Sequence, residues 1–173
     1  MSSPPASAQP EPWLRGTLTE VPAEQRAVLH ALQLAREDIV RWCGDLTDRE
    51  LHSHTHTLPS IAFQLRHIVG SLDRLLTYAE GGTLNQEQQQ QLAVEMDAGD
   101  SNHAECLAEL KRGLASAEAR IRAIDLTRWH EPRSVGRKHL PSTVAGLLIH
   151  CAEHTQRHVG QAVTTAKVLL AQR

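Results

Sequence analysis

Residues 147–161 read LLIHCAEHTQRHVGQ, and the interpretation of the whole chain starts from this stretch. The apolar residues in and around it recur at steps of three and four, which predicts one buried face of an α-helix. The stretch also holds histidines four residues apart, at His150, His154 and His158, and a glutamine at Gln161. At about 100° per residue these four side chains fall within an arc of roughly 80°. Histidines at positions i and i+4 can aim two imidazole nitrogens at one point, as paired metal ligands require.

Apolar residues with the same spacing predict four long helices in all. The predicted helices begin near Pro22, at Ser60 after Pro59, after Asp100-Ser101, and at Ser142 after Pro141. The glutamine run at 88–91 predicts a short surface helix, and residues 134–138 are compatible with a small hairpin. No alternating apolar and polar run is long enough for a larger sheet. We therefore expect an all-α protein, a four-helix bundle with long connections between its helices.

Length and composition predict a single domain. Residues 13–173 are expected to form the bundle, and residues 1–12, rich in proline and serine, a disordered arm without the apolar run of a signal peptide. No run of about 18 apolar residues exists, so no membrane span is expected.

The formal charge of −2 argues against a nucleic-acid binder. Cys43, Cys106 and Cys151 have no metal-site or disulfide spacing, so we interpret them as buried apolar residues in a cytoplasmic protein.

A metal site with an open coordination position needs a third ligand from outside the last helix. The candidate is His67, the one histidine inside the predicted second helix, which shares a flank of that helix with Gln64 and Ser71. Helical geometry permits this assignment but does not require it, because His67 also fits a boundary position. On helical spacing alone, we expect at least two of His150, His154 and His158 to bind metal.

The remaining histidines carry weaker signals. His52, His54 and His56 alternate in a polar connection and would share one side of an extended segment, but we interpret them as solvated. His139 lies shortly before the last predicted helix and could line the mouth of the site. Glu153 precedes His154, so the His-Glu-x-x-His arrangement of zinc peptidases is absent, and with it an obvious general base.

The histidine in Leu65-Arg66-His67-Ile68, together with Glu153-His154-x-x-x-His158-Val159-Gly160-Gln161, resembles the DinB/YfiT-like superfamily. The resemblance extends from about Trp13 to Leu170. It implies a four-helix bundle with a divalent metal held by His67, His154 and His158. His150, Gln161, Gln64 and His139 then become residues behind the ligands or in the cleft. It also implies a homodimer acting on a small molecule.

Some members of this superfamily are transferases or isomerases that use a low-molecular-weight thiol, so the resemblance implies thiol-dependent S-transferase chemistry for this chain. Imidazole ligands suit zinc and nickel; we expect zinc in the cell, with nickel an alternative after purification. A metal-dependent hydrolase and a non-catalytic module that binds a metal or a small ligand remain the alternatives. No nucleic-acid or membrane partner is expected.

Overall fold

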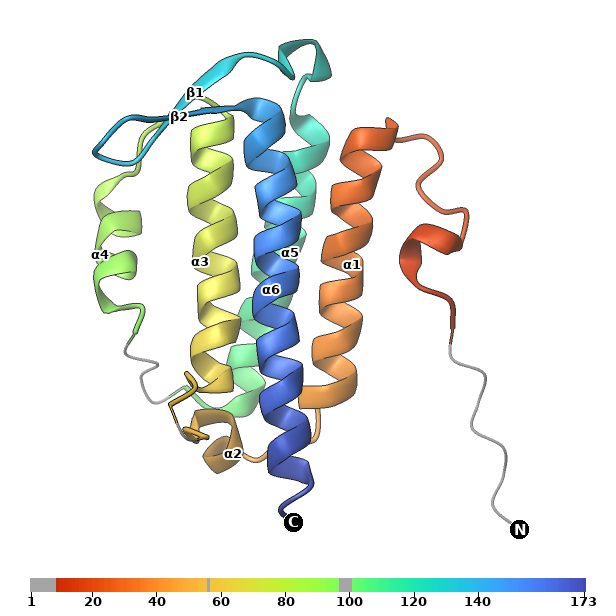
Figure 1. Ribbon diagram of the computed structural model, residues 1–173, viewed down its shortest axis with the longest axis vertical. Coiled ribbons are helices and arrows are strands. Elements are labelled where there is room, and N and C mark those ends of the chain that lie inside the picture. The colour runs from red at the N-terminus through yellow and green to blue at the C-terminus, as the bar shows by residue number, and fades with distance from the viewer. Residues whose placement is uncertain (1–8, 56, 97–100) are drawn as a thin grey trace.

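Four long helices run along a common axis in the computed structural model, which describes residues 9–55, 57–96 and 101–173 (Figure 1). They are α1 (Ala23–Cys43), α3 (Ile61–Ala79), α5 (His103–Ala123) and α6 (Val144–Leu170). The shorter elements are η1 (Pro12–Leu14), α2 (Asp48–His52), α4 (Gln86–Val94), η2 (Leu126–Arg128), β1 (Pro132–Val135) and β2 (Leu140–Thr143). The predicted all-α four-helix bundle is confirmed, and so are the surface helix and the hairpin.

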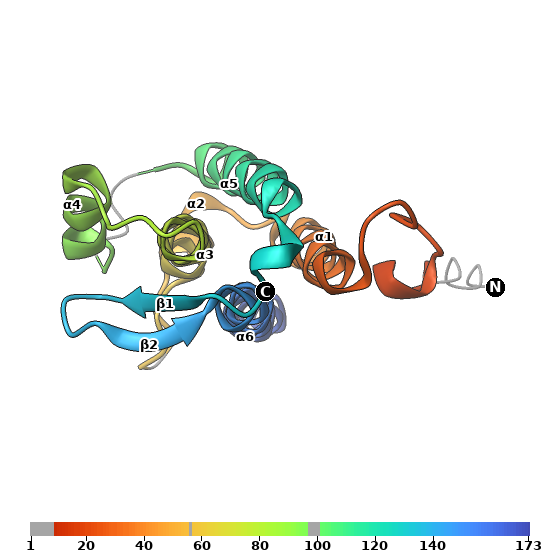
Figure 2. The same ribbon diagram turned by 90° about the horizontal axis from the view of Figure 1, so that it is seen from above.

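The bundle places α3 between α5 and α6, and α1 on the opposite side between the same two helices (Figure 2). Helices α1 and α6 run down the view of Figure 1, whereas α3 and α5 run up it. Because α3 and α5 are parallel, the chain must return along the length of the bundle between them. The connection that does so contains α4, which lies outside the bundle beside α3.

The apolar stripes predicted from the sequence form the core. The apolar faces of all four helices meet at the bundle axis. Burying each large apolar side chain there contributes roughly 1.5–3 kcal/mol to the stability of the fold. The largest fully buried side chains include Leu32, Ile39, Leu65, Ile68, Leu72, Leu114, Ile121 and Leu148. The three cysteines are buried and free, as expected. Burial raises the pKa of both Cys43 and Cys151 to about 12.

The helix starts follow local capping chemistry, with one correction. The Ser60 hydroxyl accepts a hydrogen bond from the Phe63 amide at 3.1 Å, so Ser60 caps α3 as predicted. The last helix was predicted to open at Ser142, but it begins at Val144 and is capped by Thr143. Pro141 and Ser142 instead pair with β1 in the antiparallel hairpin. Proline is tolerated there because both strands of a two-stranded sheet are edges.

The N-terminal segment is described from residue 9. The predicted arm over residues 1–12 therefore lies mostly outside the described residues, and Pro12 opens η1. None of the helices in the described part of the chain combines the length and the apolar character that a membrane span requires.

Gly113 sets the separation of α5 and α3. A β-carbon at this position would lie 2.6 Å from Val69 Cγ1 and 3.1 Å from Val69 Cβ. The contact includes the β-carbon of Val69, so a change of rotamer cannot relieve it, and the two helices would have to move apart. At Gly160, on the exposed face of α6, an added β-carbon meets nothing within 4 Å.

We therefore expect Gly113→Ala and Gly160→Ala to change stability in opposite directions. Overpacking should make Gly113→Ala destabilising by about 1–3 kcal/mol. Gly160→Ala should stabilise by up to about 1 kcal/mol, because alanine is the better helix former. Urea unfolding followed by circular dichroism measures both free energies. Equal effects of the two substitutions would contradict the close packing of α3 on α5.

Candidate metal centre

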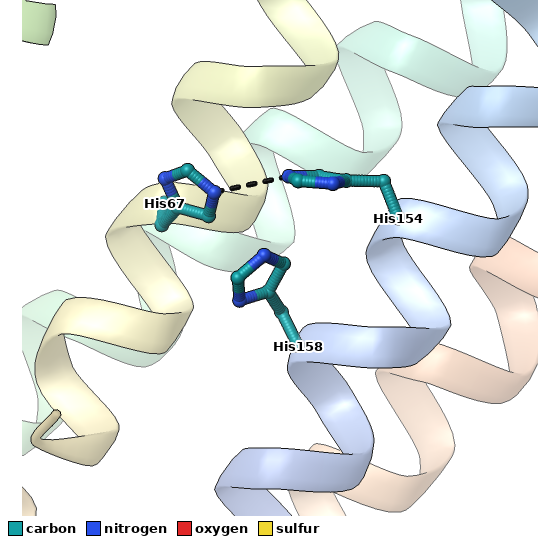
Figure 3. A group of neighbouring side chains, drawn as sticks. All are labelled: His67, His154 and His158. Carbon is teal, nitrogen blue, oxygen red and sulfur yellow. Dashed lines mark hydrogen bonds between the residues drawn. The ribbon is translucent and has the colours of Figure 1, made fainter. Parts of the chain in front are cut away.

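Three histidines from two neighbouring helices converge on one point. His67 projects from α3, and His154 and His158 project from successive turns of α6 (Figure 3). One nitrogen from each ring belongs to a set in which all members lie within 4.8 Å of one another. The Nε2 atoms of His67 and His154 are 3.0 Å apart. The centroid of the His158 ring lies 4.3 Å from that of His67 and 4.5 Å from that of His154.

The protonation of His67 is set by Glu95, the residue that follows α4. Glu95 Oε2 lies 3.0 Å from His67 Nδ1. A carboxylate only accepts hydrogen bonds, so Nδ1 of His67 is the donor and its other nitrogen, Nε2, faces the other two histidines. The Ser71 hydroxyl lies 3.3 Å from the same Nε2 atom. A carboxylate that orients a ligating imidazole and raises its basicity is a recurrent feature of metal sites.

Glu95 is itself held by Arg74, whose Nη2 donates to both carboxylate oxygens, at 2.9 and 3.2 Å. Only 6% of Glu95 and 9% of Arg74 is exposed, so the two charges neutralise each other away from water. Burial raises the pKa of Glu95, but the hydrogen bonds from His67 and Arg74 outweigh burial and leave it below its ordinary value. Glu95 is therefore an anion that accepts from His67.

The protonation of His158 is set in the same way by an amide. His158 Nδ1 donates to Gln64 Oε1 at 2.6 Å. The amide nitrogen of Gln64 in turn donates to Gln161 Oε1 at 2.9 Å, which fixes the amide orientation. Since Nδ1 of His158 carries the proton, its Nε2 has a free lone pair. Gln64 and Gln161 therefore lie behind the His158 ring, Gln64 in direct contact with it and Gln161 in contact with Gln64.

His154 differs from the other two because its Nδ1 is buried without a hydrogen-bond partner among the described residues. A buried polar atom without a partner is uncommon. Burial and the neighbouring His67 lower the pKa of His154 to about 4, and the same causes lower that of His158 to about 4. Both rings are thus neutral near pH 7, the form that binds a cation. Neutral, converging imidazoles with two orientations already fixed fit a divalent metal ion.

The structure leaves the other histidines outside this group. His150 donates from Nδ1 to Glu153 at 2.6 Å and is more exposed, although its ring centroid is 5.2 Å from that of His154. His139, predicted near the mouth of the site, belongs to the hairpin turn, where its Nδ1 lies 3.1 Å from the Ser134 hydroxyl.

His52 and His54 do not lie together in one extended segment. His52 ends α2, which the Thr47–Glu50 capping box starts, and its Nε2 donates to the Ser101 carbonyl at 2.7 Å. His54 is exposed in the connection between α2 and α3, and His56 lies outside the described residues.

A small pocket of about 220 Å³ opens beside the histidines. Its lining is His67, His154, His150, Ser71, Arg74, Leu75, Tyr78, Leu84 and Leu92. The lining thus combines imidazoles with apolar side chains, and no carboxylate among the described residues belongs to it. A molecule bound there would reach the point at which the rings converge.

The chain is thus a helical bundle with a group of three histidines that could hold a metal ion, and with a pocket beside that group. The family model of the DinB superfamily matches residues 31–162, a span that contains all three histidines. The chain therefore belongs to the DinB superfamily. No match was found among the curated proteins.

Glu95→Gln should weaken zinc binding about 10- to 100-fold, the usual effect of losing a residue behind a ligand. Glutamine keeps one acceptor for His67 but loses the charge that holds Arg74. Competition with a chromophoric chelator measures the affinity, and circular dichroism checks the fold. Glu87→Gln on the exposed face of α4 is the matched control and should bind zinc like the wild type. Equal affinities of the two variants would remove Glu95 from the centre.

The metal-free protein should lose stability as the pH falls from about 6.5 to about 4. His154 and His158 have an ordinary pKa of 6.5 in the unfolded chain and about 4 in the folded protein. The unfolded chain therefore binds more protons in this window, and the free energy of unfolding rises with pH. Urea unfolding at pH 7.5 and pH 5 measures the difference. The double variant His154→Gln, His158→Gln should show a clearly smaller difference in the free energy of unfolding between the two pH values. An unchanged difference would show that these two histidines do not cause the pH dependence.

Proposed function

We propose that the chain is a metal-dependent enzyme in which His67, His154 and His158 hold a divalent cation and a low-molecular-weight thiol serves as the nucleophile. The observation that supports this most directly is the convergence of three imidazoles on one point, two of them oriented by Glu95 and Gln64. Three protein ligands leave a coordination position open, as catalytic sites do. Zinc is the expected cation in the cell, and nickel is compatible with the same donors.

A divalent cation held by neutral ligands acts as a Lewis acid and lowers the pKa of a thiol or water molecule that it binds. The side chains around it favour the thiol. Glu95 is engaged by His67 and Arg74, and Glu153 lies on the exposed side of α6, paired with His150. Neither carboxylate lines the pocket, so a water molecule there would lack a general base. A thiol needs only to lose its proton to become a strong nucleophile.

The apolar wall of the pocket suits the second substrate. Leu75, Leu84 and Leu92 can hold the carbon skeleton of an electrophile and exclude water from the reacting atoms. In the proposed reaction the thiolate sulfur forms a bond to the electrophilic carbon. The thiol proton goes to solvent and the leaving group departs with the electron pair of the broken bond. In an addition to a double bond, the neighbouring atom takes up a proton instead. The product is a thioether.

Zinc-loaded protein should accelerate the conjugation of a thiol with monochlorobimane, and a chelator should abolish the acceleration. His67→Ala, His154→Ala and His158→Ala should each lose both stoichiometric zinc and this activity. Metal analysis by mass spectrometry and bimane fluorescence measure the two properties. His130→Ala is the control, since His130 is exposed and has no contact with the centre.

The alternatives give different results in the same experiment. Metal-dependent cleavage of an activated ester without conjugation would replace the transferase by a hydrolase. Zinc binding with neither reaction would leave a non-catalytic binding module. Retention of stoichiometric zinc by any one of the three histidine variants would remove that residue from the ligand set.

A further inference from the structure

A second and larger pocket, of about 970 Å³, lies between the β-hairpin and α4. Both elements extend to the same side of α3, with the connection between α3 and α4 close to the hairpin (Figure 2). The volume is in the range of pockets that enclose a whole small molecule. The metal centre does not use this space, and the histidine pocket is much smaller, at about 220 Å³.

The two pockets adjoin, because they share three lining residues. Tyr78 from α3, Leu84 before α4 and Leu92 in α4 line both of them. A molecule long enough to pass these three side chains would have one end at the histidines and the other between α4 and the hairpin. The larger pocket therefore lies next to the candidate site, and we call it the extension.

The far end of the extension is cationic. Arg128, Arg133 and Arg137 line it, and no acidic side chain among the described residues does. Glu131, nearby, is shared by Arg128 at 2.9 Å and Arg133 at 3.1 Å, so one carboxylate faces two guanidinium groups. Three arginines and one glutamate leave an excess of positive charge. Arginine is well suited to oxyanions because its guanidinium presents paired donors.

Two of the arginines have complementary properties. Arg133 is fixed: its Nε donates to the Ala79 carbonyl at 2.7 Å, and its side chain is only 8% exposed. Arg137 lies on the exposed hairpin turn and has no ion pair or hydrogen bond within the described part of the chain. The pocket thus combines the guanidinium of Arg133, which is held in position, with that of Arg137, which is free to bind a ligand. Together they form a candidate site for an anion.

We infer that the extension binds the anionic end of the molecule that reacts at the histidines. The ligand class is an elongated organic acid, with a carboxylate or similar oxyanion at the arginines, an apolar middle beside Leu84 and Leu92, and its reactive end at the metal. This inference rests on the proposed function only for the reactive end. The anion preference of the extension stands on the arginines alone.

The first test measures binding without chemistry. Calorimetry on the full chain, metal-free and zinc-loaded, compares 6-phenylhexanoate with the neutral 6-phenylhexanamide. The carboxylate should bind more tightly to the wild type in both forms. Arg137→Gln should weaken carboxylate binding about three- to tenfold and leave amide binding unchanged. Lys138→Gln removes the same charge from the next residue of the turn, outside the pocket lining, and should change neither.

Three outcomes would overturn the anion site: equal binding of carboxylate and amide to the wild type, equal losses in the Arg137 and Lys138 variants, or no binding of either probe. None of these outcomes affects zinc binding. Conversely, loss of the proposed metal chemistry would leave the carboxylate preference in place. The two proposals therefore fail separately.

The second test asks whether one molecule spans both pockets. In cobalt-loaded protein, a thiolate bound to the metal gives a charge-transfer absorption band. Titration with 6-mercaptohexanoate should saturate this band at a lower concentration than 6-mercaptohexan-1-ol, and Arg137→Gln should remove the difference. If both thiols saturate the band of the wild type at the same concentration, one molecule does not span both pockets. The extension would then bind an anion that is separate from the molecule at the metal.

Discussion

The antiparallel contact between α3 and α6 is the constraint on which the rest of the structure depends. The buried stripes of these helices bring His67 opposite His154 and His158 on the flank of the interface, where side chains are half-buried rather than dry. The Gln64–Gln161 and Gln64–His158 hydrogen bonds cross the same contact and fix the register of one helix on the other. A shift by one turn, about 5.4 Å, would separate the rings. The packing that stabilises the bundle thus also defines the site.

Helix α4 takes part in this arrangement through polar contacts. Its residues Leu92 and Val94 remain largely exposed, whereas Gln88 is buried and donates to Asp73 at 2.6 Å and to Thr77 at 2.8 Å. At the other end, Glu95 meets Arg74 and His67. Such buried polar groups stabilise only when all are paired, because an unpaired one keeps its full desolvation cost. The position of α4, which lines both pockets, is therefore coupled to the hydrogen bond between Glu95 and His67.

The sequence alone was sufficient for the parts of this structure that depend on local periodicity. The stripes of the four helices, the i, i+4 histidines and the Ser60 cap follow from spacing and capping chemistry. Glu95 could not be found in this way, because it follows a glutamine-rich helix without a clear apolar stripe and meets His67 across 28 residues of chain. The start of α6 was predicted two residues too early, since a Pro-Ser pair serves equally well in an edge strand. The position of His139 depends on the hairpin turn, which only tertiary structure fixes.

The burial of the three cysteines has a consequence for the proposed reaction, in which an electrophile would bind beside the histidines. Cys151 lies one helical turn before His154, yet its thiol is buried in the core, and its pKa of about 12 keeps it protonated. Alkylation requires an accessible thiolate, and so does competition for a soft cation. The chain's own thiols are thus withheld from both, and the electrophile of the proposed reaction would bind near them without alkylating the protein.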